Sequence, residues 1–160
     1  MIGPSVEVRR EDLAGAVAQL LICALNAELL ARYPEDGSTP HFRLDASEVN
    51  EGQGAFFIAY LDGEAVGCGA IRRIEPGVAE IKRMYVVPGA RGRGIGRHIL
   101  KEIEAEARRL GVRRLVLETG PRQPEAIALY ARSGFTEIPL FGDYLNSPHP
   151  ELSVCMAKGL

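Results

Sequence analysis

The chain has 160 residues, 46% of them hydrophobic, which is enough for one domain built around a single sizeable core. Its 19 basic and 21 acidic side chains give a formal net charge of −2, so the composition provides no overall attraction to nucleic acid or to an anionic membrane. The sequence contains no run of roughly 18 apolar residues, the length of a membrane span, and no apolar signal-peptide core near its start. We therefore expect one cytoplasmic domain in which any anion-binding site is local.

The cysteines and histidines indicate neither a disulfide framework nor a metal centre. Cys23, Cys68 and Cys155 are odd in number, far apart and without a Cys-x-x-Cys pair, so we expect buried free thiols in a reducing compartment. The histidines are isolated from one another, at positions His41, His98 and His149. We expect an exposed His98 and no metal site.

The first third of the chain predicts a short strand, a long helix and a polar segment. Residues 5–9 have the pattern of a strand, and residues 12–32 place apolar side chains three and four apart, as a helix with one buried face does. Pro34 and Gly37 end this helix. Residues 33–54 are rich in polar side chains, proline and glycine, which predicts a surface segment beside or over a site.

The rest of the chain alternates between predicted strands and helices. Residues 55–61 and 65–74 predict a hairpin around the Asp62-Gly63 turn, and residues 79–87 predict a third strand after a second turn at Pro76-Gly77. The remaining predictions are a helix over 92–110, a strand over 113–119, a helix over 124–133 ended by Gly134, strands over 135–138 and 151–158, and an irregular loop over 139–150. This order predicts a mixed α/β sheet rather than a fully parallel one.

The glycine-rich turn at residues 89–97, which reads Gly-Ala-Arg-Gly-Arg-Gly-Ile-Gly-Arg, is the most informative segment. A strand that leads through glycines into a helix brings free N–H groups and the positive end of a helix dipole to one point, which suits a phosphate. A Walker A loop is excluded because Arg97-His98 follow the last glycine, and the dinucleotide pattern G-x-G-x-x-G would need glycine at Arg97. The alternative is a plain connector with a solvated basic helix face.

Residues 91–96, Arg-Gly-Arg-Gly-Ile-Gly, resemble the Q/R-x-x-G-x-G/A signature of the GCN5-related N-acetyltransferases (GNAT), in which the loop amides hold the pyrophosphate of acetyl-CoA. The resemblance covers residues 79–138, including Glu125-Ala-Ile-Ala-Leu-Tyr-Ala-Arg-Ser-Gly-Phe135, and the hairpin before them also fits. It implies a single-domain, GNAT-like fold with a mixed, mostly antiparallel twisted sheet flanked by helices. Residues of about 1–54 would then form N-terminal helices and the acceptor-site segment, about 55–138 the cofactor-binding core, and about 139–160 a C-terminal loop and strand.

The resemblance also implies where acetyl-CoA, the co-substrate, would bind. Backbone groups of the strand predicted over residues 79–87 would pair with the pantetheine arm and polarise the thioester carbonyl. Gln123 stands where many relatives have an asparagine that contacts the cofactor, so this position departs from the family pattern. The implied cofactor-binding residues are Met84, Tyr85, Val86, Arg91, Gly92, Arg93, Gly94, Ile95, Gly96, Arg97 and Gln123.

Acetyl transfer to an amine needs a base and an acid. An alkyl ammonium has a pKa of about 10.4, so a carboxylate or a water relay must take a proton before attack. By resemblance the base is Glu80 or Glu118, with Glu80 ranked first, and Tyr130 donates a proton to the departing thiolate. The alternative is that each carboxylate is merely a surface or salt-bridged group, paired for example with Lys82 or Arg83, and that Tyr130 is only packed.

The acceptor is the least determined part of the prediction. Residues in segments that flank the expected pocket are Arg32, Tyr33, Arg43, Phe141 and Tyr144, and an arginine among them would grip a substrate carboxylate unless it is ordinary surface. We expect a small-molecule or amino-acid-like amine as the substrate, with no nucleic acid or membrane partner, and leave a homodimer open. The alternatives are acetylation of protein lysines or N-termini, and a non-catalytic CoA-binding sensor or interaction module.

Overall fold

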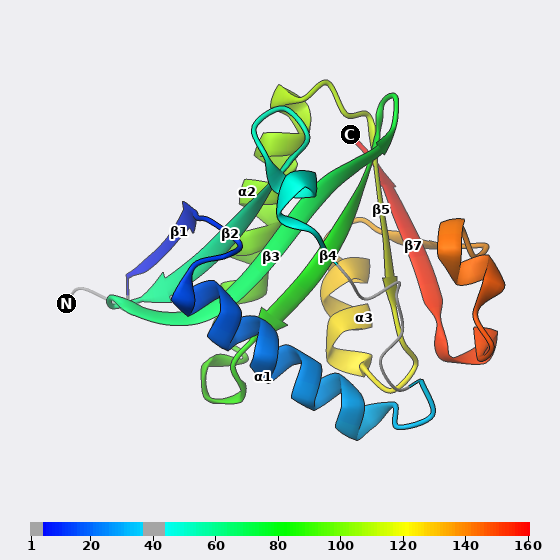
Figure 1. Ribbon diagram of the computed structural model, residues 1–160, viewed down its shortest axis with the longest axis horizontal. Coiled ribbons are helices and arrows are strands. Elements are labelled where there is room, and N and C mark those ends of the chain that lie inside the picture. The colour runs from blue at the N-terminus through cyan, green and yellow to red at the C-terminus, as the bar shows by residue number, and fades with distance from the viewer. Residues whose placement is uncertain (1–4, 37–43) are drawn as a thin grey trace.

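The computed structural model describes residues 5–36 and 44–160, which form a seven-stranded sheet with helices on both faces (Figure 1). The strand order is β1-β2-β3-β4-β5-β7-β6, and the pairing of β4 with β5 is parallel whereas the other neighbours are antiparallel. The strands are β1 Val6–Arg10, β2 Gly54–Leu61, β3 Glu64–Glu75, β4 Val78–Val86, β5 Arg114–Thr119, β6 Thr136–Ile138 and β7 Val154–Gly159. The predicted mixed, mostly antiparallel sheet is confirmed.

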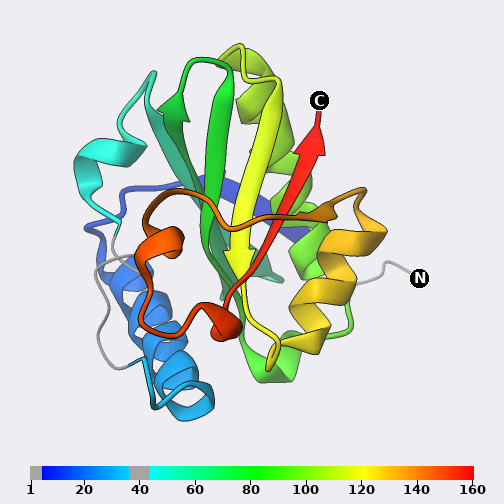
Figure 2. The same cartoon turned by 90° about the vertical axis from the view of Figure 1, so that its right-hand side faces the viewer.

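The helices form one layer on each side of this sheet. Helix α1 (Ala16–Arg32) covers one face, and α2 (Ile95–Arg109) and α3 (Pro124–Arg132) cover the other, as the side view shows (Figure 2). In the described part of the chain, four short 3₁₀ helices occupy the connections: η2 Ala46–Val49, η3 Pro88–Ala90, η4 Gly142–Asn146 and η5 Pro150–Leu152. The central strands β2 to β5 are therefore buried on both faces, whereas the edge strands β1 and β6 contain no buried residue.

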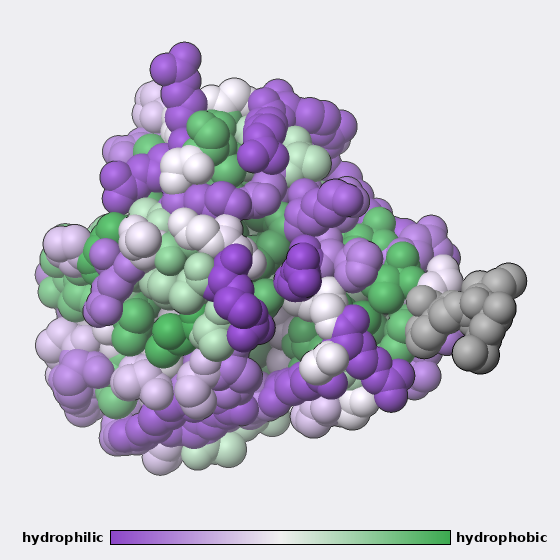
Figure 3. Space-filling model, turned by 180° about the vertical axis from the view of Figure 1, so that it is seen from behind, coloured by the Kyte–Doolittle hydropathy of each residue, from purple (hydrophilic) through white to green (hydrophobic). Residues whose placement is uncertain are grey.

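Strand β2 illustrates how the sequence builds two cores. Ala55, Phe57 and Ala59 point to the α2 side, whereas Phe56 and Ile58 point to the α1 side. Helix α2 contributes a buried apolar stripe to the first core and exposes charged residues on its other face. Seen from behind, the molecule has hydrophobic areas that are interrupted by hydrophilic side chains (Figure 3).

Several predicted boundaries are shifted, each for a local reason. The first helix begins at Ala16 rather than at residue 12, because Asp12 makes a turn in which its side chain accepts the Ala14 N–H. The second helix begins at Ile95 rather than at residue 92, because Gly94 has a left-handed φ of 78°. The last strand begins at Val154 rather than at residue 151, since η5 precedes it. The predicted loop over 139–150 likewise contains η4.

Two other expectations about single residues need correction, and two predicted positions lie outside the described residues. Tyr33, predicted on a surface segment, is buried, and its hydroxyl accepts the Arg122 N–H at 2.9 Å. Cys23 is exposed, whereas Cys68 and Cys155 are buried as expected. His98 is exposed, as predicted. The remaining positions His41 and Arg43 lie outside the described residues.

The sheet opens between β4 and β5. These strands pair from Val78 with Arg114 to Ile81 with Leu117, and no further register pair joins them although both continue. Two residues of β4 face one residue of β3 close to this point, and the bulge contains Arg83 at a φ of 58°. The parting of two parallel strands leaves an opening at their carboxyl ends, where a ligand commonly binds in α/β sheets.

Candidate active site

The glycine-rich loop forms the left-handed entry to α2 that a phosphate site requires. Gly92 and Gly94 have φ values of 80° and 78°, a region that side chains with a Cβ rarely adopt. The His98 N–H donates to the Gly94 carbonyl at 3.1 Å, which makes this the first bond of the helix. The N–H groups of Ile95 and the two residues after it therefore have no partner within α2. Together with the helix dipole they make an anion-binding position.

A groove of about 490 Å³ runs from this loop along the end of β4 and one side of α3. It is lined by Glu28, Met84, Tyr85, Val86, Ala90, Arg91, Gly92, Gly94, Ile95, Gly96, Arg97, Gln123, Glu125, Ala126, Ala128, Leu129, Tyr130 and Arg132. The structure thus brings together every predicted cofactor-binding residue except Arg93. That residue lines a neighbouring basic hollow together with Arg97, Lys101, Arg132 and Lys158.

Arg91 and Gly96 have structural contacts that the loop motif alone does not reveal. The Arg91 guanidinium donates to the Val86 carbonyl at 2.8 Å and to Glu28 at 2.7 Å, so it ties the loop to β4 and α1. A Cβ at Gly96 would lie 2.7 Å from a methyl group of Leu129. Gly96 therefore permits close packing of α2 against α3, the helix that carries Tyr130.

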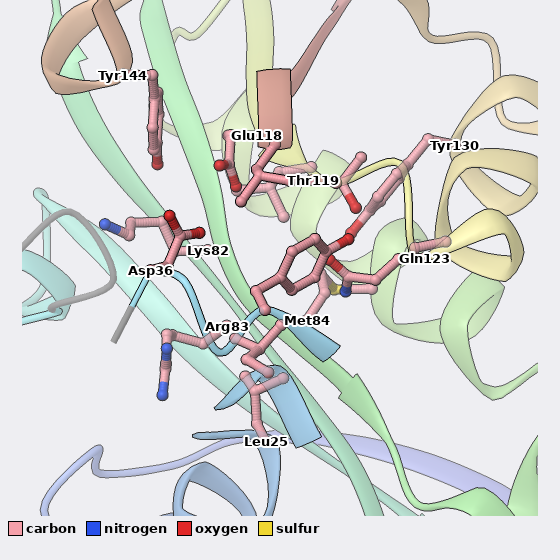
Figure 4. A pocket seen from close by; sticks show the side chains of 16 residues that line it. Leu25, Asp36, Lys82, Arg83, Met84, Glu118, Thr119, Gln123, Tyr130 and Tyr144 are labelled. Atoms are coloured by element: carbon pink, nitrogen blue, oxygen red, sulfur yellow. The ribbon is translucent and has the colours of Figure 1, made fainter. Parts of the chain in front are cut away.

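A second, narrower cavity of about 80 Å³ adjoins the groove where β4 and β5 part, and we call it the acceptor pocket (Figure 4). Its walls come from α1, β4, β5, α3, η4 and η5: Leu25, Leu29, Tyr33, Asp36, Ile81, Lys82, Arg83, Met84, Glu118, Thr119, Gly120, Gln123, Ala126, Tyr130, Tyr144 and Leu152. Four residues line both hollows, namely Met84, Gln123, Ala126 and Tyr130. A group held in the groove can therefore reach a group held in the pocket.

Glu118 extends from β5 into the acceptor pocket. Its carboxylate accepts a hydrogen bond from the Ser153 hydroxyl at 2.9 Å. Burial raises the pKa of Glu118 to about 8, and the nearby charges of Asp36 and Glu80 contribute in the same direction. A carboxylic acid with this pKa exchanges its proton close to neutral pH, as a general base does.

Glu80 is held in a different way. Its side chain is buried and accepts two hydrogen bonds from Arg72, at 3.0 and 2.8 Å, and one from the Tyr144 hydroxyl at 2.6 Å. Arg72 also pairs with Glu48. Glu80 faces a separate hollow with Phe141 and does not belong to the lining of the acceptor pocket. These bonds make Glu80 part of a buried ion-pair network.

Tyr130 lies where the groove meets the pocket, with its hydroxyl end turned inward (Figure 4). Its ring packs edge-to-face against Phe135 at a centroid distance of 5.7 Å, which fixes its orientation. Burial raises the pKa of the phenol above its ordinary value, so the hydroxyl keeps its proton at neutral pH and remains a donor.

The predicted acceptor residues are only partly assembled. Tyr33 and Tyr144 line the acceptor pocket, whereas Phe141 packs against Tyr144 outside it. Arg32 forms ion pairs with Glu125 and Glu28 and does not belong to the pocket lining.

The sequence reasoning missed Asp36, which lines the pocket and stands in a polar segment that offers no local motif. It also missed Arg72, although the turn at Pro76-Gly77 places Arg72 directly across from Glu80. Within residues 5–36 and 44–160 no group of three or more acidic, cysteine or histidine side chains is placed to hold a metal ion.

Comparisons with known proteins agree with this geometry. The model of the acetyltransferase (GNAT) family matches residues 22–135. An IAA acetyltransferase of Azospirillum brasilense is 43% identical over 159 residues, which are 98% of this chain and 99% of that protein. A solved structure from Klebsiella pneumoniae, provisionally named an acyl-CoA N-acyltransferase, superposes with a TM-score of 0.79 at 36% identity over 97% of each chain.

A GNAT acetyltransferase of Elizabethkingia anophelis solved with acetyl-CoA bound shares the fold, with a TM-score of 0.68 at 17% identity over 97% of this chain and 98% of its own. In the part of the chain that the structure describes, no helix is long and apolar enough to cross a membrane. The family match covers most of the chain and includes the phosphate-type loop, the opening of the sheet and Tyr130. The chain therefore belongs to the acetyltransferase (GNAT) family and is an acetyltransferase of the GNAT type.

Proposed function

We propose that this protein transfers the acetyl group of acetyl-CoA directly to the amine of a small molecule while both substrates are bound. The observation that carries the proposal is the junction of the groove and the acceptor pocket at Met84, Gln123, Ala126 and Tyr130. A carboxyl group with a pKa of about 8 lies on the pocket side of this junction, and a protonated phenol lies at the junction itself. Direct transfer requires such adjacency of the two substrates.

The groove has the chemistry of a CoA site. The free N–H groups at the start of α2 suit a pyrophosphate, and the cations Arg97 and Arg132 stand beside them. The part of β4 beyond Ile81 is not paired with β5, so it offers an edge along which the amide-bearing pantetheine arm would lie. Acetyl-CoA supplies the activated acetyl group when it is bound.

We assign the role of general base to Glu118 in preference to Glu80. Glu118 lies in the acceptor pocket and changes protonation close to neutral pH, whereas Glu80 accepts three hydrogen bonds and faces another hollow. In the proposed reaction Glu118 removes one proton from the ammonium group of the acceptor. The neutral amine then attacks the thioester carbon, a C–N bond forms and the C–S bond breaks.

We assign Tyr130 as the acid that protonates the departing sulfur. Its hydroxyl keeps its proton at neutral pH and lies at the junction, which is where the thioester must be for attack from the pocket. The second proton that the nitrogen loses replaces the one given up by Tyr130. The overall products are an N-acetyl amide, free CoA and one proton, which leaves from Glu118.

The narrowness of the acceptor pocket favours a small amine over a protein substrate. A volume of about 80 Å³ accommodates a small polar group and a short carbon chain, whereas a lysine within a folded protein needs an open surface groove. The IAA acetyltransferase relative carries a small-molecule name as well. We set aside the alternative of a non-catalytic CoA-binding module, because the chain is an acetyltransferase of the GNAT type.

The test combines binding and turnover. Acetyl-CoA should raise the melting temperature, whereas ATP and NAD should shift it little. A panel of small amines and lysine peptides is then assayed with acetyl-CoA by the release of free thiol. We expect turnover with small amines and little with peptides. Turnover with lysine peptides and not with small amines would refute the small-molecule assignment, and stronger stabilisation by ATP would refute the CoA site.

A further inference from the structure

Asp36 is an unexplained acidic group in the wall of the acceptor pocket. It follows α1 by four residues, and its N–H donates to the Tyr33 carbonyl at 3.1 Å, which fixes its backbone beside the pocket. Its Oδ1 atom is buried, and no residue within 5–36 and 44–160 donates a hydrogen bond to it. Figure 4 shows Asp36, Glu118 and Tyr130 reaching the pocket from different elements.

A buried carboxylate oxygen without a donor is unusual in a folded protein. Leaving such an atom unsatisfied is costly, most of all when the group is charged, so buried polar atoms nearly always have a partner. The partner must donate hydrogen bonds, and a positive charge would also favour the ionised form of the neighbouring Glu118. An ammonium group provides both.

We propose that Asp36 binds the ammonium group of the acceptor beside Glu118 and thereby selects amines that are positively charged at neutral pH. This inference rests on the proposed acetyl transfer and names its substrate class. The ammonium group donates one hydrogen bond to Asp36 and gives one proton to Glu118. The proton that leaves the ammonium group goes to Glu118 and not to Asp36, so the proton balance of the reaction is unchanged.

The other residues around the pocket are consistent with ammonium binding by Asp36 and proton removal by Glu118. Leu25, Leu29 and Leu152 form an apolar wall that suits the carbon skeleton of an amine. The charged and titratable groups that influence Glu118 or line the pocket with it come from every neighbouring element: Tyr33, Asp36, Glu80, Lys82, Arg83, Tyr130, Tyr144 and Cys155. Among these, Asp36 is the acid with a buried, unpaired oxygen.

Asp36→Asn tests the inference because it keeps the shape and removes the charge. Glu35→Gln is the matched control, since Glu35 is the adjacent acid, pairs with Arg122 and does not belong to the pocket lining. Both variants are assayed with the best primary alkylamine of the panel, which is charged at pH 7, and the best aromatic amine, which is neutral. The loss of a charge-assisted hydrogen bond should raise KM for the alkylamine by about 10- to 100-fold.

Three further results are expected of Asp36→Asn. KM for the aromatic amine should stay within about threefold of wild type, because a neutral acceptor makes no ion pair with Asp36. The affinity for acetyl-CoA should be unchanged. The acid limb of kcat/KM against pH should move to lower pH, because the negative charge of Asp36 contributes to the raised pKa of Glu118. A residue with a merely structural role would not move this limb.

An unchanged KM for the alkylamine, or equal losses with both amines, would overturn the inference while leaving acetyl transfer intact. Wild-type preference for aromatic over alkyl amines would overturn it too. A wild-type protein that acetylates neither class would instead refute the proposed function, and the inference with it. Melting curves of both variants show whether a loss comes from unfolding.

Discussion

Replacing Glu118 by glutamine tests the mechanism most directly, because it removes the proton acceptor while keeping the size of the side chain. Glutamine can still accept the hydrogen bond from the Ser153 hydroxyl. If Glu118 supplies the usual share of general-base catalysis, kcat should fall by roughly 10² to 10⁴. The affinity for acetyl-CoA should not change, because Glu118 lines the pocket and not the groove.

The raised pKa of Glu118 also predicts the pH dependence of the wild-type enzyme. With a pKa of about 8, roughly one tenth of the side chains are ionised at pH 7 and about nine tenths at pH 9. The value of kcat/KM for a charged alkylamine should therefore rise about tenfold between these two pH values and then level off. In Glu118→Gln this rise of kcat/KM with pH, the acid limb of the profile, should disappear.

The same pKa makes a prediction for stability with a definite sign. Between its ordinary pKa of 4.5 and about 8, Glu118 holds a proton in the folded protein and not in the unfolded chain. The free energy of unfolding should therefore fall as pH rises through this window. Glu118→Gln, which cannot ionise, should be more stable than wild type at pH 9, with a difference of up to about 5 kcal/mol.

The assays are stopped-time thiol release from pH 6 to 10 and denaturant unfolding over the same range. Glu64→Gln is a suitable control, because Glu64 is exposed on the β2–β3 hairpin and lines neither the groove nor the acceptor pocket. A Glu118→Gln variant with a full rate and an unchanged acid limb would refute the assignment of the base. Equal loss of activity in the control would show that the effect is not specific.

Three further substitutions separate catalysis from packing. Tyr130→Phe keeps the ring contact with Phe135, so kcat should fall by about 10- to 10³-fold while acetyl-CoA affinity and melting temperature hold; full activity would rule out the acid role. Glu80→Gln should mainly lower the melting temperature, because it breaks a buried pair with Arg72, and a loss of kcat like that of Glu118→Gln would restore Glu80 as the base. Gly96→Val should reduce both stability and acetyl-CoA affinity, because its side chain displaces α3; unchanged affinity would place the cofactor elsewhere.

Helices, strands and turns whose formation is determined by residues close together in the sequence were predictable. The hairpin turns, the amphipathic α2 and the glycines before it each carry a local signal, and the structure confirms the corresponding strands and helix within a few residues. Errors occur where one side chain changes the local geometry. Asp12 delays the start of α1, and the left-handed Gly94 delays the start of α2.

The acceptor pocket was harder to predict because its walls come from segments far apart in the chain. Asp36 and Glu118 meet only because α1 and β5 both end at the opening of the sheet. No spacing or periodicity in the sequence connects them. Arg72 is an exception, because the register of the β3–β4 hairpin places Arg72 opposite Glu80. The positions of the two strands around the Pro76-Gly77 turn would have been enough to predict this ion pair.

The two glutamates show why residue type alone does not decide a catalytic role. Both lie on strands beside the opening, and both resemble bases in the family. Glu80 meets Arg72 and Tyr144, whose hydrogen bonds occupy both of its oxygens. Glu118 is buried beside Asp36, which disfavours its charge until a cation arrives. A positively charged acceptor would therefore promote the ionisation of the base that deprotonates it, so binding of the substrate and activation of Glu118 would be coupled.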